Sequence, residues 1–161
     1  MSPAATKELF REAWGNFPSG VSVVTFYRDD GAVHGLTANS VCSVSMDPML
    51  LLICIDHKAR SFPMLAKSER FAMNFLADGQ TKESGFFARS DTDEAPPFSF
   101  RKSAHGYPVL EGCAAYMDCA VFEKHTAGDH TIFLGKVEEI EAYAREPLVY
   151  CAGEYAQLIR P

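Results

Sequence analysis

Short runs of β-branched and aromatic residues recur along the chain, and each run is bounded by turn-forming residues. This pattern is typical of strands connected by tight turns. It predicts strands at 21–28, 33–45, 49–56 and 70–77, two strands within 114–143 joined near Ala127, and a strand-like piece broken by a glycine within 147–159. The RDDG sequence at 28–31 predicts a hairpin turn. Many short strands with few helices favour a small antiparallel barrel, a β-rich α+β fold, over a parallel sheet.

Helical spacing is confined to a few short segments. Residues 3–17 carry apolar side chains at helical spacing, which predicts an amphipathic helix that ends at the FPSG sequence. A short helix is expected at 60–68 and a weaker one at 81–89. Residues 90–110 hold three prolines and show no clean period, so they predict a long irregular loop of the kind that can form a lid. No repeat or linker interrupts the sequence, and we expect a single domain over 1–161.

The charge balance excludes several classes of partner. The net charge of −6 argues against nucleic acid or an anionic membrane surface, because both require a basic face. No apolar run approaches the roughly 20 residues that a membrane-spanning helix needs. The five cysteines are odd in number and have no CxxC spacing, which predicts a reducing, cytoplasmic location. The histidines do not cluster with these cysteines, so no metal site is predicted.

The GLTANS sequence at 35–40 places small and hydrogen-bonding residues between two apolar strands. Glycine permits the close approach of a ligand or of another backbone, while Thr37, Asn39 and Ser40 offer donors and acceptors. A flat heteroaromatic ligand such as a flavin would use an edge of this kind. The alternative is an edge strand with a bulge, and this stretch alone leaves both interpretations open.

A basic segment follows the next apolar strand, in the CIDHKARSF sequence at 54–62. Lys58, Arg60 and Ser61 lie where a short helix is expected to begin, and exposed amides, positive charge and a hydroxyl together favour an anion such as phosphate. A solvated loop with a serine cap accounts for the same residues equally well.

The GDHT sequence at 128–131 places His130 at a turn that leads into a strand. A histidine beside a carboxylate can orient a substrate or move a proton, although solvent-facing turn histidines look the same in sequence. The remaining histidines are interpreted as surface or loop residues, with His57 close to the expected phosphate site. GxGxxG, P-loop and GxSxG motifs are absent, so a bound nucleotide would need another mode of binding, and acyl transfer is unsupported.

Taken in order, the segments GLTANSVCSVSMDPMLLLICID, HKARSF and GDHTIFLGKVEEIE resemble the short-chain flavin reductase family. The resemblance extends over about 17–155, and Met49 departs from it at a position where a proline is common. It implies an FMN-binding split β-barrel with a few short flanking helices. It also implies a homodimer with the site at its interface, and a role as the reductase component of a two-component flavin monooxygenase.

The resemblance also implies roles for individual residues. The flavin ring and ribityl chain would be lined by Thr37, Ala38, Asn39 and Ser40, continued by Ser43, Val44 and Ser45. Cys54, Ile55 and Asp56 would lie beside the flavin, and Lys58, Arg60 and Ser61 would hold its phosphate. His130 would contact the nicotinamide nucleotide, and Tyr155 would approach the site from the tail.

The implied activity is hydride transfer from NADH or NADPH to FMN, with FAD as a possible substitute. The flavin would carry the redox chemistry, and the protein would supply position and electrostatics. A non-enzymatic flavin carrier with the same barrel is the main alternative, because it would need the residues at 37–40 and 58–61 but not His130. A plain β-barrel interaction module would explain neither the basic segment nor the order of the motifs.

Overall fold

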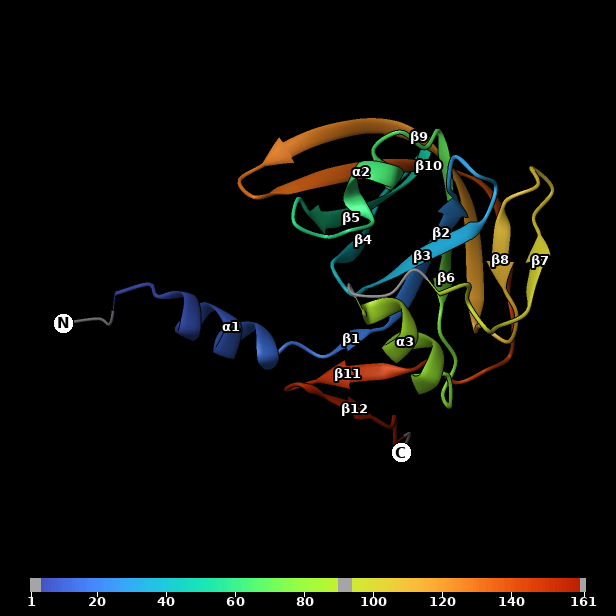
Figure 1. Cartoon of the computed structure of the whole chain (residues 1–161). Coiled ribbons are helices and arrows are strands. Elements are labelled where there is room, and N and C mark those ends of the chain that lie inside the picture. Colours follow the sequence, from blue (N-terminus) through green and yellow to red (C-terminus); the bar gives the residue numbers. More distant parts are fainter. Residues whose placement is uncertain (1–3, 90–93, 160–161) are drawn as a thin grey trace.

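The computed structural model describes residues 4–89 and 94–159, and its largest sheet has seven antiparallel strands (Figure 1). The strand order is β3-β2-β6-β9-β10-β5-β4. The strands are β2 (Ser22–Tyr27), β3 (Val33–Ala38), β4 (Val41–Met46), β5 (Met49–Asp56), β6 (Arg70–Phe75), β9 (Ala115–Ala127) and β10 (His130–Ala142). This arrangement confirms the predicted β-rich fold with few helices.

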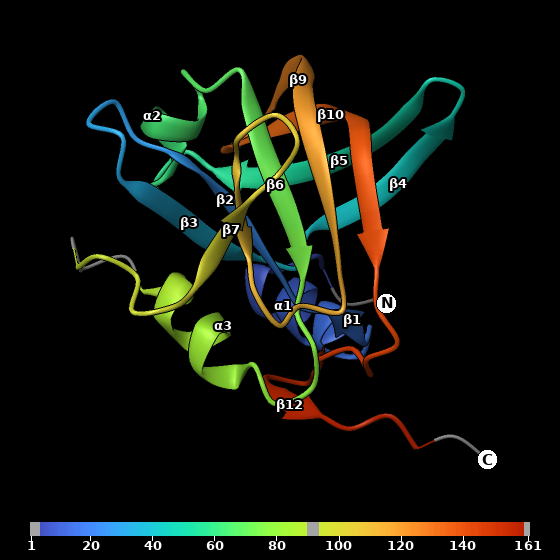
Figure 2. The same cartoon turned by 90° about the vertical axis from the view of Figure 1, so that its right-hand side faces the viewer.

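The two edge strands of this sheet, β3 and β4, are neighbours in the sequence, so the sheet must curl until its edges approach each other. Figure 2 shows the curl, with β4 and β5 running at a steep angle to β6. The carbonyl of Ser40 accepts a hydrogen bond of 3.0 Å from the amide of Cys54 on β5. The prediction of one continuous strand over 33–45 is therefore wrong, because the chain passes from one edge to the other at Asn39 and Ser40.

Two smaller sheets flank the large one. β1 (Ser19–Gly20), β11 (Val149–Cys151) and β12 (Glu154–Ala156) form a three-stranded sheet, and β7 (Phe100–Lys102) pairs with β8 (Pro108–Leu110). The expected irregular loop at 90–110 is thus corrected to a hairpin over its second half, while residues 90–93 lie outside the described part. Strands of three residues are too short to show a period in the sequence.

Three helices are present in the described residues: α1 (Lys7–Gly15), α2 (Phe62–Leu65) and α3 (Thr81–Ala88). α1 begins after Thr6, whose side chain accepts a hydrogen bond from the amide of Leu9, and none of its residues is buried. Residue 3, where this helix was expected to begin, lies outside the described part. In 4–89 and 94–159 no helix has the length and apolar character needed to cross a membrane.

The interior of the curled sheet is filled by large apolar side chains from several strands. Phe26, Ile53, Phe71, Met73 and Phe133 are fully buried and belong to one cluster. Burial of this kind is the main stabilising contribution to a small barrel. The core holds the pleated strands in place, so that the strand ends at one side of the barrel have fixed positions.

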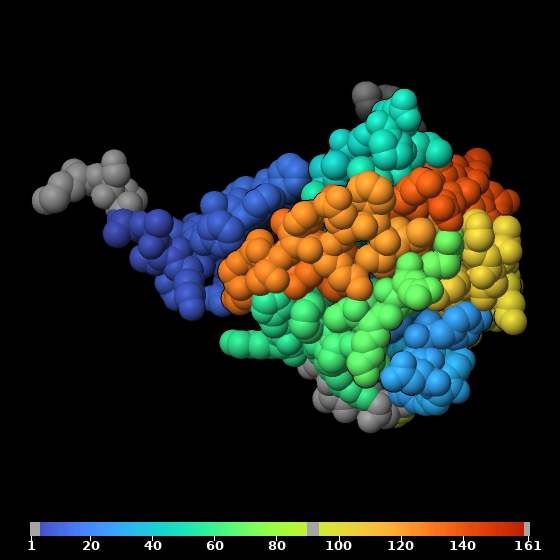
Figure 3. All heavy atoms as spheres, turned by 90° about the horizontal axis from the view of Figure 1, so that it is seen from above, coloured from blue at the N-terminus to red at the C-terminus, as the bar shows by residue number. Residues whose placement is uncertain are grey.

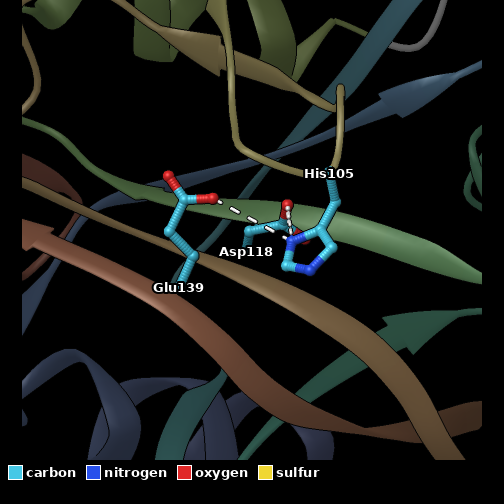
Figure 4. Close-up of side chains that lie close together, drawn as sticks. All are labelled: His105, Asp118 and Glu139. Carbon is cyan, nitrogen blue, oxygen red and sulfur yellow. Dashed lines mark hydrogen bonds and ion pairs between the residues drawn. The ribbon is translucent and has the colours of Figure 1, made fainter.

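A polar cluster fastens the β7–β8 loop to the large sheet (Figure 4). Asp118 is fully buried and accepts hydrogen bonds from Arg70 (2.8 Å) and Ser103 (2.5 Å). His105 Nδ1 lies 3.2 Å from the same carboxylate and 3.9 Å from Glu139, which accepts from the amide of Ala104. A buried carboxylate is costly unless it is paired in this way, so the cluster has a structural explanation.

Candidate functional site

A pocket of about 200 Å³ opens where the edges of the curled sheet approach each other. It is lined by residues 36–40 from the end of β3 and the following turn, by residues 54–56 from the end of β5, by Ala59, and by His130 at the start of β10. Three segments that the sequence singled out separately therefore contribute to one cavity.

The strand pairing explains why His130 reaches this pocket. β10 runs antiparallel to β5, and the Cα of His130 is paired with that of Asp56. The turn before His130 is held by a 2.9 Å hydrogen bond from the amide of His57 to the carbonyl of Asp129. His130 is therefore fixed at the mouth of the pocket, directly beside the end of β5.

A carboxylate sets the hydrogen-bonding character of His130. Its Nδ1 lies 2.7 Å from Asp129 Oδ1, and this bond lowers the pKa of the Asp129 carboxyl. An ionised carboxylate only accepts hydrogen bonds, so Nδ1 must be the protonated nitrogen. In the neutral ring Nε2 is then an acceptor, and the side chain is 41 % exposed. His130 can thus accept a hydrogen bond from a ligand at the pocket mouth.

The hydroxyl oxygen of Thr37 can only accept a hydrogen bond from a ligand, because its single proton is already donated within the protein. Thr37 Oγ1 donates to the carbonyl of Ser84 in α3 at 2.7 Å. α3 also lies very close to β3, since a Cβ added at Gly35 would come within 2.9 Å of Phe87. This close approach explains the small residue in the strand, and it holds Thr37 in place.

Tyr155 reaches the same part of α3 from the C-terminal strand β12. Its hydroxyl donates to Ser84 Oγ at 2.9 Å, and its ring packs edge-on against Tyr150. Tyr155 does not line the pocket in the described structure. It contacts the same helical residue as Thr37, so its connection to the site is indirect.

The basic segment borders the pocket. Ala59 lines the cavity, with Lys58 and Arg60 on either side of it in the sequence. Asp56 shapes the turn by accepting a 2.8 Å hydrogen bond from the amide of Lys58. Ser61 is only 7 % exposed, and within the described chain its hydroxyl makes no capping bond to α2. The serine-cap alternative is therefore not what the structure shows, and this hydroxyl has a different partner.

That partner is His34, which the sequence analysis assigned to the surface or a loop. This assignment is wrong, because His34 is half-buried on β3 and its Nε2 lies 3.0 Å from Ser61 Oγ. Burial lowers the pKa of His34, and the positive charges of Arg60 and Arg28 lower it further. The ring is therefore neutral near pH 7. No sequence signal marks the contact, since 27 residues separate the two side chains.

Cys54 is half-buried in the pocket wall, and burial raises the pKa of its thiol. It therefore contributes a small, neutral side chain rather than a thiolate. Ser43, Val44 and Ser45 continue along β4, but none of them lines the pocket in the described chain. Val44 is instead 46 % exposed on the outer strand.

Two further residues of the pocket, Leu36 and Ala59, were not predicted from the sequence. Both are apolar and lie beside residues that were selected for their polar chemistry. Their positions within the GLTANS and CIDHKARSF motifs were the only sequence signal that could have identified them. A larger groove of about 520 Å³ lies elsewhere, between residues 67–69 and 121–124. It contains none of the predicted site residues.

Comparison with known proteins gives consistent similarities. The family described as "Flavin reductase like domain" matches residues 14–158. The reductase component of a flavin-dependent trigonelline monooxygenase from Acinetobacter baylyi is 40 % identical over 145 residues, which are 90 % of this chain and 47 % of that protein. The chain therefore spans about half the length of that relative. An NADH-dependent flavin reductase from a Rhodococcus species is 35 % identical over 161 residues, covering 98 % of this chain and 90 % of that protein.

A solved structure with the same fold was obtained in complex with fragments of both kinds of nucleotide. It is the NADH:FAD oxidoreductase SgcE6 of Streptomyces globisporus in complex with NAD and FAD fragments. The TM-score is 0.89 at 32 % sequence identity, and the match covers 98 % of each chain.

Proposed function

The chain belongs to the family of flavin reductase-like domains, and we propose that it is an NAD(P)H-dependent flavin reductase. The reaction is the transfer of a hydride from reduced nicotinamide to FMN or FAD. A single domain over 1–161 carries this activity in the proposal. The observation that supports it most is the pocket itself, where the ends of β3 and β5 meet His130.

The pocket lining fits a flavin. Leu36, Ile55 and Ala59 provide apolar surface for a flat ring, and the turn at 38–40 provides a polar edge with little side-chain bulk. At about 200 Å³ the cavity is smaller than the roughly 300–1,000 Å³ of typical ligand pockets. A flavin would therefore extend beyond it, toward the basic segment on one side and a second chain on the other.

When bound, the flavin supplies the ring that accepts the hydride, and a proton completes its two-electron reduction. The protein's contribution is position and polarity. Thr37, Ala38, Asn39 and Ser40 hold the ring and ribityl chain, beside the wall formed by Cys54, Ile55 and Asp56. The hydroxyl of Thr37 acts here as an acceptor, because its proton is donated to Ser84.

Lys58, Arg60 and Ser61 hold the flavin phosphate in this proposal. They follow directly after the pocket-lining end of β5, and the hydroxyl of Ser61 is not used to cap α2. Charged side chains and a hydroxyl form stronger hydrogen bonds to a phosphate than to neutral groups. The phosphate would thus anchor the flavin at the edge of the cavity while the ring occupies it.

His130 seats the nicotinamide. With Nδ1 donating to Asp129, Nε2 of the neutral ring can accept a hydrogen bond from the carboxamide NH₂ of the nicotinamide. Such a bond would orient the ring that gives the hydride over the pocket mouth. The role of His130 is substrate positioning, and the mechanism requires no protein nucleophile.

A homodimer completes the site in this proposal. Phe10 and Trp14 on α1 are 66 % and 58 % exposed, and Met46 on β4 is 85 % exposed. Figure 3 shows α1 as a lobe that stands away from the body of the molecule. Exposed apolar surface of this extent favours association. The outer part of β4, with Ser43, Val44 and Ser45, would then line the site from the interface, and Tyr155 would support it from the tail.

The partner of the reaction is a flavin-dependent monooxygenase that takes up the reduced flavin. The trigonelline monooxygenase relative is named as such a reductase component, and this supports the same role here. A cytoplasmic location is part of the proposal as well. It is supported by the five cysteines, all of which are free in the structure.

Flavin-dependent oxidation of NADH and NADPH tests this function. The purified protein should oxidise at least one of them, and only when FMN or FAD is added. Titration of the protein with FMN should show saturable binding. Binding without any oxidation would favour the flavin carrier, and the absence of both would overturn the proposed function.

A further inference from the structure

The contact between His34 and Ser61 joins β3 to the start of α2, and no sequence motif contains both residues. His34 lies on β3 opposite Phe26 of β2, and its ring meets the Phe26 ring edge-on at 5.5 Å between centroids. Ser61 lies at the start of α2 and is 7 % exposed. The 3.0 Å distance between Nε2 and Oγ is therefore set by packing on both sides.

The number of protons in this pair limits what Ser61 can do. A serine hydroxyl has one proton to donate and two lone pairs to accept with. Phosphate oxygens that carry charge only accept, so Ser61 binds a phosphate only if its own proton is available. When Nε2 accepts that proton, the hydroxyl presents lone pairs to the anion and repels it. When Nε2 is itself protonated, it donates to Oγ and the hydroxyl proton is free.

The His34 ring is neutral near pH 7, because burial lowers its pKa and Arg60 and Arg28 add to this effect. A neutral imidazole carries its single proton on either nitrogen. The two tautomers therefore give Ser61 opposite hydrogen-bonding characters. A phosphate at Ser61 selects the tautomer with the proton on Nε2.

We propose that His34 is a positioning residue for the flavin phosphate: its Nε2–H donates to Ser61 Oγ and turns the hydroxyl proton of Ser61 toward the phosphate. This rests on the proposed function, in which Ser61 is a phosphate ligand. His34 itself does not touch the flavin. Its effect is confined to ligands that carry the phosphate, and it acts only through Ser61.

A comparison of FMN with riboflavin, which lacks the phosphate, isolates this effect. Ser61→Ala and His34→Phe are titrated with both ligands; phenylalanine keeps an aromatic ring beside Phe26 but offers no donor. Hydrogen bonds to charged groups correspond to roughly ten- to 150-fold in affinity. We expect a loss of FMN affinity in that range for Ser61→Ala and a several-fold loss for His34→Phe. Riboflavin affinity should stay within about twofold in both, given the usual error of such comparisons.

Two further variants separate positioning from a structural role. His34→Gln restores a side-chain donor and should recover part of the FMN affinity. The double variant His34→Phe with Ser61→Ala should bind FMN no more weakly than Ser61→Ala alone, because His34 acts only through that hydroxyl. Far-UV circular dichroism and thermal unfolding report whether each variant folds. If His34→Phe fails to fold, His34→Leu, which also lacks a donor, provides the same comparison with and without Ser61→Ala.

Three results would overturn the proposal. They are unchanged FMN affinity in His34→Phe, an equal loss for FMN and riboflavin, and additive losses in the double variant. Equal affinity of the wild type for FMN and riboflavin would contradict the assignment of a phosphate site and therefore the role of His34. It would leave the proposed flavin binding intact. Failure of the wild type to bind either ligand would instead reject the proposed function as a whole.

Discussion

At the scale of single residues, the site depends on hydroxyl and imidazole protons whose direction is fixed by a neighbour. Thr37 donates to Ser84, and His130 is oriented by Asp129. In each case the partner decides whether the side chain donates to a ligand or accepts from it. Such pairs explain why residue types alone leave the chemistry of a site open.

Replacement of His130 separates nicotinamide binding from flavin binding. In His130→Ala the loss of one hydrogen bond should cost about 1–3 kcal/mol, or roughly five- to 150-fold in kcat/KM for the nicotinamide. The FMN dissociation constant should stay nearly unchanged, because the proposed ring and phosphate contacts lie on β3, β5 and the basic segment. Steady-state kinetics beside an FMN titration measure both quantities.

His57→Ala is a useful comparison for His130→Ala. His57 is a neighbouring histidine whose Nε2 lies 2.9 Å from Thr131 Oγ1, and it does not line the pocket. His57→Ala should therefore lower kcat/KM for the nicotinamide less than His130→Ala does. Equal losses of kcat/KM and of FMN affinity in His130→Ala would assign that residue to the fold or the flavin.

Sequence reasoning found the polar residues of the site but not how they are paired. Thr37, Asp56 and His130 could be selected because they stand out at the ends of apolar runs. His34 could not, because its role depends on Ser61, which is distant in sequence and close only after the sheet has curled. Local pattern carries no information on contacts of this kind.

At the scale of elements, the β9–β10 ribbon carries His130 to the pocket. Its pairing register shifts between Leu134 and Gly135, where Phe122 of β9 has no partner in the register. Such a bulge bends and twists a ribbon. Gly135 lies at the bend, and a Cβ added there would come within 2.6 Å of Phe71 and 3.0 Å of Cys119. The glycine is therefore required for the ribbon to pack on β6.

Gly135→Ala should destabilise the fold by about 1–3 kcal/mol, as overpacking of a well-filled core does. Gly85→Ala is the matched control, because Gly85 lies in α3 with open space around its Cβ position. Alanine in a helix should stabilise the protein by about 0.5–1 kcal/mol relative to glycine. Urea unfolding followed by far-UV circular dichroism measures both changes. Equal stability of the two variants would contradict the packing argument.

The elements themselves were largely predictable, because runs of apolar, β-branched and aromatic residues bounded by turn residues mark β2, β5, β6, β9 and β10. The exceptions have physical reasons. β7 and β8 have three residues each, which is too short for a period to show. β3 and β4 were merged, since the step from one edge of the sheet to the other depends on closure of the whole barrel and not on a local breaker.

At the scale of the whole molecule, the proposed homodimer links assembly to flavin binding. Met46→Asp places a charge on the exposed outer strand of the proposed interface, and it should shift the protein toward monomer and weaken FMN binding. Lys82→Asp introduces the same residue at an exposed position of α3 and should change neither property. Sedimentation velocity at micromolar concentration, together with an FMN titration, tests both. A wild type that sediments only as monomer would contradict the proposed dimer.

In the proposed reaction, this barrel brings a flavin and a nicotinamide together so that a hydride passes between them. The most direct measurement is anaerobic stopped-flow absorption of the FMN-loaded protein after mixing with NADH or NADPH. We expect the visible flavin absorption to disappear while an equal amount of nicotinamide is oxidised, more slowly in His130→Ala. Retention of the flavin absorption with both nucleotides, in a protein that binds FMN, would contradict the proposed reaction and identify a carrier.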